Sequence, residues 1–372
     1  MKIDIIAGAR PNFVKIAPII SEIKKTHSAG SDVTYRLIHT GQHYDNDMSQ
    51  SFFEQLEIPL PDINLGAHGG TQAEMTSKIM LGYEKLLSEE RSNLCLVVGD
   101  VTSTMACAIV AQKAGIPVAH VEGGLRSNDW TMPEEINRLV TDSITNYFFI
   151  TSEYANQNLL LNGIPKDRIF LVGNTMIDTL LKYQTKLIKP TFFNEFNLLP
   201  NNYFVLTLHR PSNVDSYDNL SNFLSLISLH SRGFPVVFPV HPPRTAKALS
   251  SGSGKYNNIF FVSPLSYLEF IYLVKYSKAV VTDSGGITEE TTAMGIPCMT
   301  LRDNTERPET CFLGTNELLG TDPSKIGPAF AKLFKGDWKK GQIPPLWDGF
   351  TSERIVNILL KEFNINHKNC KL

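Results

Sequence analysis

The sequence lacks several features that would assign it to a specialised class of protein. Its five cysteines are scattered and form no C-x-x-C pair. This pattern excludes a disulfide framework and favours a reduced, cytoplasmic protein. No run of 18 apolar residues occurs, so we expect no transmembrane helix. The charges nearly cancel, with 35 basic and 37 acidic residues, which gives no indication of a nucleic-acid or membrane-surface partner.

Short catalytic signatures are also missing. The chain contains no H-E-x-x-H motif, no Walker A loop and no nucleophile elbow. No group of cysteines and histidines has the spacing of a metal site, so we expect no bound metal. Any chemistry must therefore come from side chains that are distant in the sequence.

The pattern of apolar segments predicts the fold class. The chain has 372 residues, 42% of them hydrophobic, which suits two domains with substantial cores. Short apolar runs such as "KIDIIAG" and "NLCLVVGD" alternate with amphipathic stretches, and we place helix starts at Ser103, Pro133 and Ser152. This alternation is typical of a doubly wound α/β fold with a parallel sheet.

A second set of strands begins after a weaker stretch at residues 174–200, with "YFVLTLH", "FPVVFPVH" and "AVVTDSGG" among its members. We therefore predict two Rossmann-like domains facing each other across a cleft. Residues 1–172 form the first, and residues 173–351 form the second. The last segment, about 352–372, reads as a terminal helix. Ligands of such sheets bind outside the carboxyl ends of the strands, where the unusual residues of this chain lie.

In the first half, three strand ends carry candidate residues. "GARPNFVK" places Arg10 and Lys15 near a helix start, where cations are disfavoured unless an anionic ligand is bound, although they could also be solvated surface charges. Asp100 follows the strand in "VVGDVTST" and could simply cap a helix. "HVEGGLRSNDWTMPEEINR" holds Glu122, together with Glu134 and Arg138 four residues apart, a spacing that also fits a weak surface ion pair.

In the second half, His209 and His241 end successive strands, where a single histidine would usually be structural. The stretch "TDSGGITEE" combines a glycine pair at a helix start, which attracts anions, with two glutamates that repel them. Carboxylates, histidines and arginines at these edges suit proton transfer beside a bound phosphate.

Ten ordered segments from residue 8 to about residue 356 resemble the UDP-N-acetylglucosamine 2-epimerases. They include "GARPNFVKIAPI", "VVGDVTST", "HVEGGLRS", "MPEEINR", "TLHRPSN", "DSGGITEE" and "DGFTSERIV". The resemblance implies the two-domain fold of the GT-B glycosyltransferases, with the terminal helix packing back on the first domain. It also implies a cytoplasmic homodimer that interconverts UDP-GlcNAc and UDP-ManNAc without a cofactor, for surface polysaccharide synthesis.

The resemblance also implies roles for individual residues. It makes Asp100, Glu122, Glu134 and His209 the acid–base candidates. It implies that the ribose hydroxyls are held by Glu290. It places the remaining candidates around the diphosphate, the sugar and the cleft: Arg10, Lys15, Arg138, His241, Ser284, Gly285, Gly286 and Arg307.

Some positions depart from the family pattern. Gly69 and Gly70 stand where allosterically regulated bacterial members carry an Arg-Gln pair, so we do not expect that regulation. Other activities stay open: a hydrolysing epimerase that releases ManNAc and UDP, an epimerase of a modified UDP-2-acetamido sugar, a silent nucleotide-sugar binding protein, and a GT-B glycosyltransferase.

Overall fold

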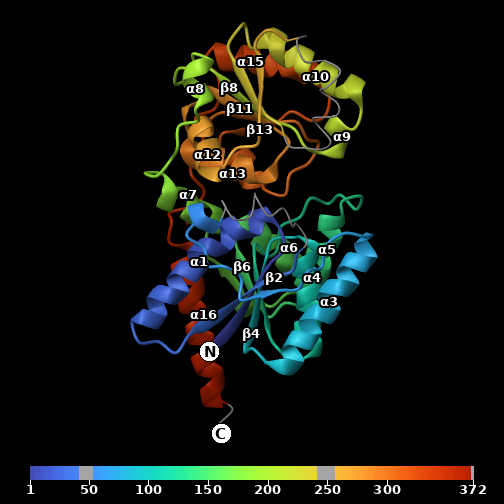
Figure 1. Cartoon of the computed structure of the whole chain (residues 1–372), viewed down its shortest axis with the longest axis vertical. Helices are drawn as coiled ribbons and strands as arrows, with labels where there is room; N and C mark the ends of the chain where they lie inside the picture. The colour runs from blue at the N-terminus through green and yellow to red at the C-terminus, as the bar shows by residue number, and fades with distance from the viewer. Residues whose placement is uncertain (42–52, 241–255, 370–372) are drawn as a thin grey trace. The chain divides into compact units, whose positions relative to one another are not determined.

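The computed structural model describes residues 1–41, 53–240 and 256–369. The chain divides into two α/β units (Figure 1). Unit 1 comprises Met1–Lys182 and Pro345–Leu372, and unit 2 comprises Tyr183–Pro344. The chain thus leaves unit 1, builds the whole of unit 2, and then returns to unit 1.

Unit 1 is built on a parallel sheet of seven strands in the order β3-β2-β1-β4-β5-β6-β7. The central strands are buried along nearly their whole length, as expected when helices cover both faces of a parallel sheet. Because β4 pairs with β1 on the side opposite to β2, the strand order reverses between β1 and β4. The strands are β1 (Lys2–Ala7), β2 (Thr34–His39), β3 (Ile63–Asn64), β4 (Leu94–Val98), β5 (Val118–Val121), β6 (Tyr147–Ile150) and β7 (Ile169–Leu171).

The helices of unit 1 include one from the returning segment, which packs beside α1 (Figure 1). Asp178 caps the start of this α16 helix by accepting hydrogen bonds from the backbone N–H groups of Thr351, at 3.1 Å, and Ser352, at 2.7 Å. Trp347 is buried and donates to the carbonyl of Thr151 at 3.1 Å. The helices are α1 (Arg10–Ser28), α3 (Gln72–Glu89), α4 (Thr102–Lys113), α5 (Pro133–Ile144), α6 (Glu153–Leu161), α7 (Thr175–Tyr183) and α16 (Thr351–Asn369), with a 3-10 turn at Lys166–Arg168.

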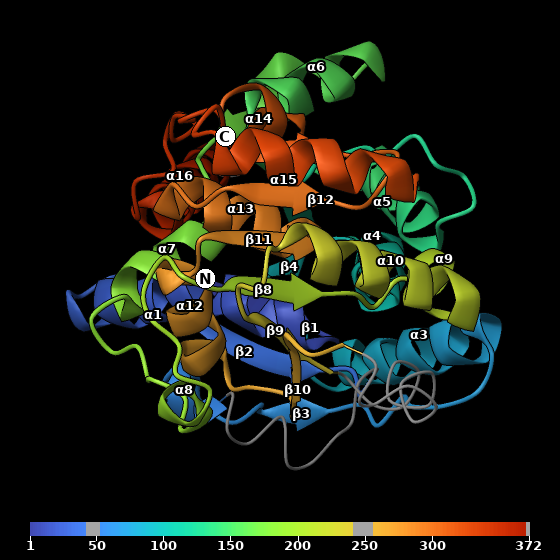
Figure 2. The same ribbon diagram turned by 90° about the horizontal axis from the view of Figure 1, so that it is seen from above.

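Unit 2 repeats the same plan with a parallel sheet of six strands in the order β10-β9-β8-β11-β12-β13 (Figure 2). Here the order reverses between β8 and β11, whose final residues, Thr207 and Thr282, are partners in register. The strands are β8 (Phe204–Thr207), β9 (Val236–Pro239), β10 (Ile259–Val262), β11 (Ala279–Thr282), β12 (Cys298–Thr300) and β13 (Asn316–Leu318).

Two apolar clusters form the core of unit 2. One contains Phe204, Phe223 and Phe330, and the other contains Phe193 and Tyr203. The helices are α8 (Phe192–Glu195), α9 (Pro211–Val214), α10 (Tyr217–His230), α12 (Tyr267–Tyr276), α13 (Gly285–Met294), α14 (Pro308–Phe312) and α15 (Ile326–Phe334), with a 3-10 turn at Pro323–Lys325.

The two parallel-sheet units confirm the predicted fold class. Helix α5 begins at Pro133, and Ser152 caps α6 through the backbone N–H of Ala155, both as expected. The prediction that Ser103 caps a helix is wrong, because α4 begins at Thr102 and its N-cap is Val101. The residues that the structure describes include no helix long and apolar enough to cross a membrane.

Candidate active site

The strand order of unit 1 reverses between β1 and β4, and at this reversal point Gly8 packs tightly against its neighbours. A Cβ at Gly8 would lie 2.0 Å from Ser103 Oγ, so only glycine fits between β1 and α4. The turn is fixed by Asn12, whose Oδ1 accepts from the backbone N–H groups of Gly8 and Ala9 at 3.1 and 2.9 Å. Its Nδ2 donates to the carbonyl of Val98 at the end of β4, at 3.0 Å. The loops after β1 and β4 are therefore held together at the position where such sheets bind ligands.

A buried ion pair joins this turn to the end of β5. Lys15 Nζ lies 2.7 Å from Glu122 Oε2, and the two residues are 7% and 2% exposed. Glu122 has a φ of 71°, a left-handed conformation that is uncommon for a residue with a side chain. Backbone strain of this kind clusters at functional sites. From the sequence, the charge of Lys15 was expected to face an anionic ligand. In the structure, Lys15 pairs with the Glu122 carboxylate of the same unit.

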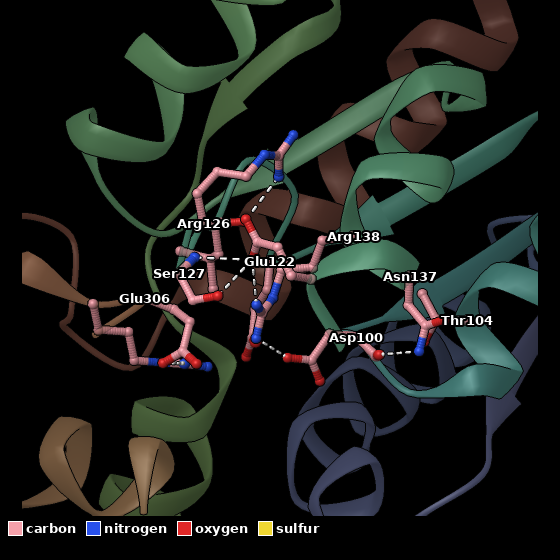
Figure 3. A network of polar contacts seen from close by, with 12 residues as sticks. Asp100, Thr104, Glu122, Arg126, Ser127, Asn137, Arg138 and Glu306 are labelled. Atoms are coloured by element: carbon pink, nitrogen blue, oxygen red, sulfur yellow. Dashed lines mark hydrogen bonds and ion pairs between the residues drawn. The ribbon is translucent and has the colours of Figure 1, made fainter. Parts of the chain in front are cut away.

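Asp100 is held from helix α5 (Figure 3). The Arg138 guanidinium pairs with the Asp100 carboxylate and also with Glu135 Oε2, at 2.7 Å. Asn137 Nδ2 donates to the backbone carbonyl of Asp100 at 2.9 Å. Ser127 donates to Glu135 from both its backbone N–H and its hydroxyl, each at 2.9 Å. Arg138 thus pairs with Asp100 and Glu135, whereas the spacing had also fitted a weak surface pair with Glu134.

Beneath these carboxylates lies a buried group centred on His120. Its Nε2 lies 2.8 Å from the carbonyl of Gly99, and its Nδ1 lies 2.8 Å from Asp142 Oδ1. Asp142 Oδ2 also accepts from the Gly124 N–H at 3.0 Å and from Arg126 at 2.6 Å. Burial alone would raise the pKa of Asp142, but His120 and Arg126 outweigh burial and lower it. This group ties the residue before Asp100 to the turn after Glu122.

In unit 2, the reversal point holds a histidine and a carboxylate. His209 Nδ1 lies 2.8 Å from Asp283 Oδ1. Asp283 is fully buried and also accepts from the backbone N–H of Arg210 at 2.9 Å and from Asn213 Nδ2 at 3.0 Å. Burial would raise the pKa of Asp283, but the bonds from His209, Arg210 and Asn213 lower it below its ordinary value.

The next residues begin helix α13 with the predicted glycine pair. A Cβ on Gly285 would lie 3.3 Å from Arg307 Nη1 and 3.6 Å from Arg302 Nη1, so two guanidinium groups lie beside the helix start. Both are neutralised inside unit 2. Arg302 makes a bidentate pair with Glu306 at 2.9 and 2.8 Å, and Arg307 Nε lies 2.5 Å from Glu289. The N-terminus of α13 adds backbone N–H groups that favour an anion at the same point.

The two glutamates of "TDSGGITEE" are both buried, Glu289 fully and Glu290 with 3% exposed. Glu289 pairs with Arg307, as described above. Burial raises the pKa of Tyr267 well above its ordinary value, and the neighbouring Glu290 raises the pKa further.

The other predicted residues are placed as follows. Arg10, Glu134, Ser284, Gly285 and Gly286 are half-buried and lie in the first turns of α1, α5 and α13 or just before them. His241 lies outside the described residues.

Five residues that hold the candidate residues or their loops in place were not predicted from the sequence: Asn12, His120, Glu135, Asp142 and Asp283. Asp283 carried a usable signal, because it directly follows a buried strand, as Glu122 does, and Asp100 comes two residues after another. Over residues 1–41, 53–240 and 256–369, no cluster of histidine, cysteine or carboxylate side chains is arranged to hold a metal ion.

Comparison with known proteins places these features in a family. The family model for UDP-N-acetylglucosamine 2-epimerase matches residues 25–360. The UDP-N-acetylglucosamine 2-epimerase of Methanocaldococcus jannaschii is 40% identical over 96% of this chain and 99% of its own length. A Pseudomonas aeruginosa UDP-2,3-diacetamido-2,3-dideoxy-D-glucuronate 2-epimerase is 37% identical over 97% of this chain and 100% of its own.

Solved structures agree with this result. The M. jannaschii UDP-GlcNAc 2-epimerase, in complex with UDP-GlcNAc and UDP, has a TM-score of 0.86 at 40% identity and covers 97% of this chain and 100% of its own. The Neisseria meningitidis UDP-GlcNAc 2-epimerase bound to UDP-GlcNAc has a TM-score of 0.87 at 31% identity, with the same coverage.

Two doubly wound units, with carboxylates and a histidine at the reversal points of their sheets, define an α/β enzyme of the acid–base type. The chain belongs to the UDP-N-acetylglucosamine 2-epimerase family, as its sequence motifs indicated. It is therefore an epimerase, an enzyme of the isomerase class.

Proposed function

We propose that the protein interconverts UDP-GlcNAc and UDP-ManNAc without releasing free sugar. The observation that carries this proposal is the pair of carboxylates at the unit 1 sheet edge, Asp100 and Glu122, each held by its own cation. The M. jannaschii and N. meningitidis epimerase structures both contain UDP-GlcNAc, which supports this sugar nucleotide as the substrate.

The chemistry explains why several proton carriers are needed. The hydrogen on C2 of the sugar is very weakly acidic, because no carbonyl lies beside it in the ring. In the proposed mechanism a base removes this proton while the C1–O bond breaks and the bond electrons pass to the diphosphate of UDP. The resulting glycal takes a proton on the other face of C2, and UDP adds back at C1. Asp100, Glu122, Glu134 and His209 are the groups we assign to these transfers.

The substrate must stay bound between the two halves of this reaction. We assign the diphosphate to the start of α13, where Ser284, Gly285 and Gly286 leave the backbone N–H groups approachable. We assign the ribose hydroxyls to Glu290 as acceptor, and we assign Arg10, Arg307 and His241 to further contacts with the substrate. The ion pairs of Lys15 and Arg138 favour a second role for these cations, because each contacts and positions one of the proposed acid–base carboxylates.

Incubation with UDP-GlcNAc in D₂O, followed by NMR of the products, tests this proposal. We expect a stable mixture with UDP-ManNAc and deuterium at C2. Stoichiometric free ManNAc and UDP would overturn the proposal in favour of a hydrolysing epimerase. Sugar transfer to an added acceptor would identify a glycosyltransferase, and UDP binding without deuterium uptake would identify a binding protein.

A second candidate follows from the P. aeruginosa relative, which is 37% identical and is named for a UDP-2,3-diacetamido sugar. Under this alternative UDP-GlcNAc would be turned over poorly. A UDP-2,3-diacetamido-2,3-dideoxyglucuronate would then exchange its C2 proton faster than UDP-GlcNAc in the same assay. If the family role in surface polysaccharide synthesis applies, either product would supply a ManNAc-type precursor. We further propose a homodimer, which size-exclusion chromatography with light scattering would test.

A further inference from the structure

His209 and Asp283 differ sharply in exposure although they are in direct contact. The His209 side chain is 54% exposed, whereas the Asp283 side chain is fully buried. Asp283 comes directly after β11, and His209 comes two residues after the neighbouring strand β8. The last residues of these strands, Thr207 and Thr282, are in register and bonded through their hydroxyls at 2.6 Å. The imidazole therefore projects from a rigid sheet edge and is anchored at its inner nitrogen only.

Asp283 is surrounded by donors. Its Oδ1 faces His209 Nδ1 at 2.8 Å and the His209 backbone N–H at 3.1 Å. Its Oδ2 accepts from the Arg210 N–H at 2.9 Å and from Asn213 Nδ2 at 3.0 Å. An ionised carboxylate has only acceptors to offer, so His209 must carry a hydrogen on Nδ1. The neutral ring consequently has its lone pair on Nε2, the nitrogen on the far side of the ring from Asp283.

We propose that Asp283 is a positioning residue that fixes the tautomer of His209 and so makes Nε2 the atom that exchanges a proton with the substrate. This inference rests on the acid–base role proposed above for His209. When Nε2 accepts a proton, the ring becomes an imidazolium, keeps its Nδ1 hydrogen and is compensated by the Asp283 anion. When Nε2 releases the proton, the neutral ring with its hydrogen on Nδ1 is restored. Asp283 itself takes up no proton in either direction.

The contacts dictate what an amide at position 283 would do. In Asp283→Asn, we expect the side-chain oxygen to take the place of Oδ2, because three donors reach that atom: Asn213 Nδ2 and the backbone N–H groups of Arg210 and, at 3.1 Å, His209. The amide nitrogen is then placed against His209 Nδ1 and donates to it. The ring can accept that bond only by moving its hydrogen to Nε2, which removes the outward lone pair. The same exchange in a Ser-His-Asp triad produces the wrong tautomer and a large loss of rate.

The test combines histidine NMR with kinetics on the full chain. With ¹⁵N-labelled histidine, long-range ¹H–¹⁵N spectra report the tautomer of each of the nine histidines, and His209→Gln identifies the signal of interest. We expect the Nδ1–H form in the wild type and the Nε2–H form in Asp283→Asn. The variant should lose about 10²–10⁴-fold in kcat with UDP-GlcNAc. Its Kd for UDP should stay within about threefold, since the ring orientation changes little.

Asn213→Ala is the matched control, because it removes a different donor from the same buried carboxylate. It should lower the thermal midpoint yet keep the Nδ1–H tautomer. An Nε2–H form in the wild type would overturn the proposal without any variant, as would Asp283→Asn with near-normal kcat. Failure of the proposed function can be told apart from failure of this inference. In that case the wild-type enzyme would show no C2 exchange with UDP-GlcNAc, but NMR would still report the tautomer of His209.

Discussion

Replacing Lys15 with methionine tests whether the Lys15–Glu122 pair is a stabilising element of unit 1. The two residues are 7% and 2% exposed, and their charged atoms are 2.7 Å apart. Methionine has a similar length but no charge, so the change removes the cation from beside a buried carboxylate. Breaking a buried pair in this way costs about 3–5 kcal/mol. With a urea m-value of about 2–3 kcal/mol/M, the midpoint should fall by about 1–2.5 M.

The three tryptophans allow unit 1 to be observed separately. Trp130 and Trp347 belong to unit 1 and Trp338 to unit 2, so a Trp338→Phe background leaves fluorescence from unit 1 alone. This matters because two units need not unfold in a single transition. In the same background, adding Glu122→Gln to Lys15→Met removes the stranded charge and should recover part of the lost stability. A single-variant loss below about 1 kcal/mol, or no recovery in the double variant, would refute the reasoning.

Three further predictions follow. Asp100→Asn and Glu122→Gln should each lower kcat about 10²-fold or more with unchanged UDP affinity, measured by C2 exchange and calorimetry. Since the pKa of Asp142 is lowered by folding, the stability of wild type over Asp142→Asn should be constant above about pH 5. It should decline below about pH 4, in urea titrations. Asp178→Ala should remove the cap of α16, cost about 1–2 kcal/mol, and raise hydrogen exchange at the start of that helix.

Each of these predictions has its own contradicting result. Wild-type rates in both carboxylate variants would remove them from the acid–base set. A stability difference that persists unchanged to pH 3 would show that Asp142 is not held ionised by folding. Unaltered exchange at the start of α16 would mean that Asp178 does not hold this helix. Asp167→Ala is a suitable control for the last case, because Asp167 is an exposed acid of the same unit.

The sequence allowed the fold to be predicted because its signals are local. Parallel strands that are buried on both faces appear in the sequence as apolar runs. Polar residues within two positions of their ends mark the functional edge, as with Asp100, Glu122 and His209. Such local signals do not predict which charged residues form ion pairs with each other. Lys15 and Glu122 are 107 residues apart, and Arg138 and Asp100 are 38 apart. Which carboxylate neutralises which cation depends on the strand order, and the spacing of residues within a motif does not encode it.

The glycine pair shows the same limit at smaller scale. The glycine pair was expected at a helix start with the glutamates behind it, and α13 does begin at Gly285. Local reasoning gave Glu289 no partner, because Arg307 reaches it only after β12 and a loop. It also passed over Asp283, whose importance comes from a histidine on a different strand.

The return of the chain to unit 1 has a consequence for synthesis on the ribosome. Unit 2 is one continuous segment, Tyr183–Pro344, and can complete its contacts as soon as that segment has emerged. Unit 1 begins first yet must wait for residues beyond Pro345, which supply Trp347 to the Thr151 carbonyl and Thr351 and Ser352 to Asp178. Unit 1 is thus synthesised first but completes its folding last. Until α16 emerges, the apolar surface beside α1 that α16 covers stays exposed to solvent or to other proteins.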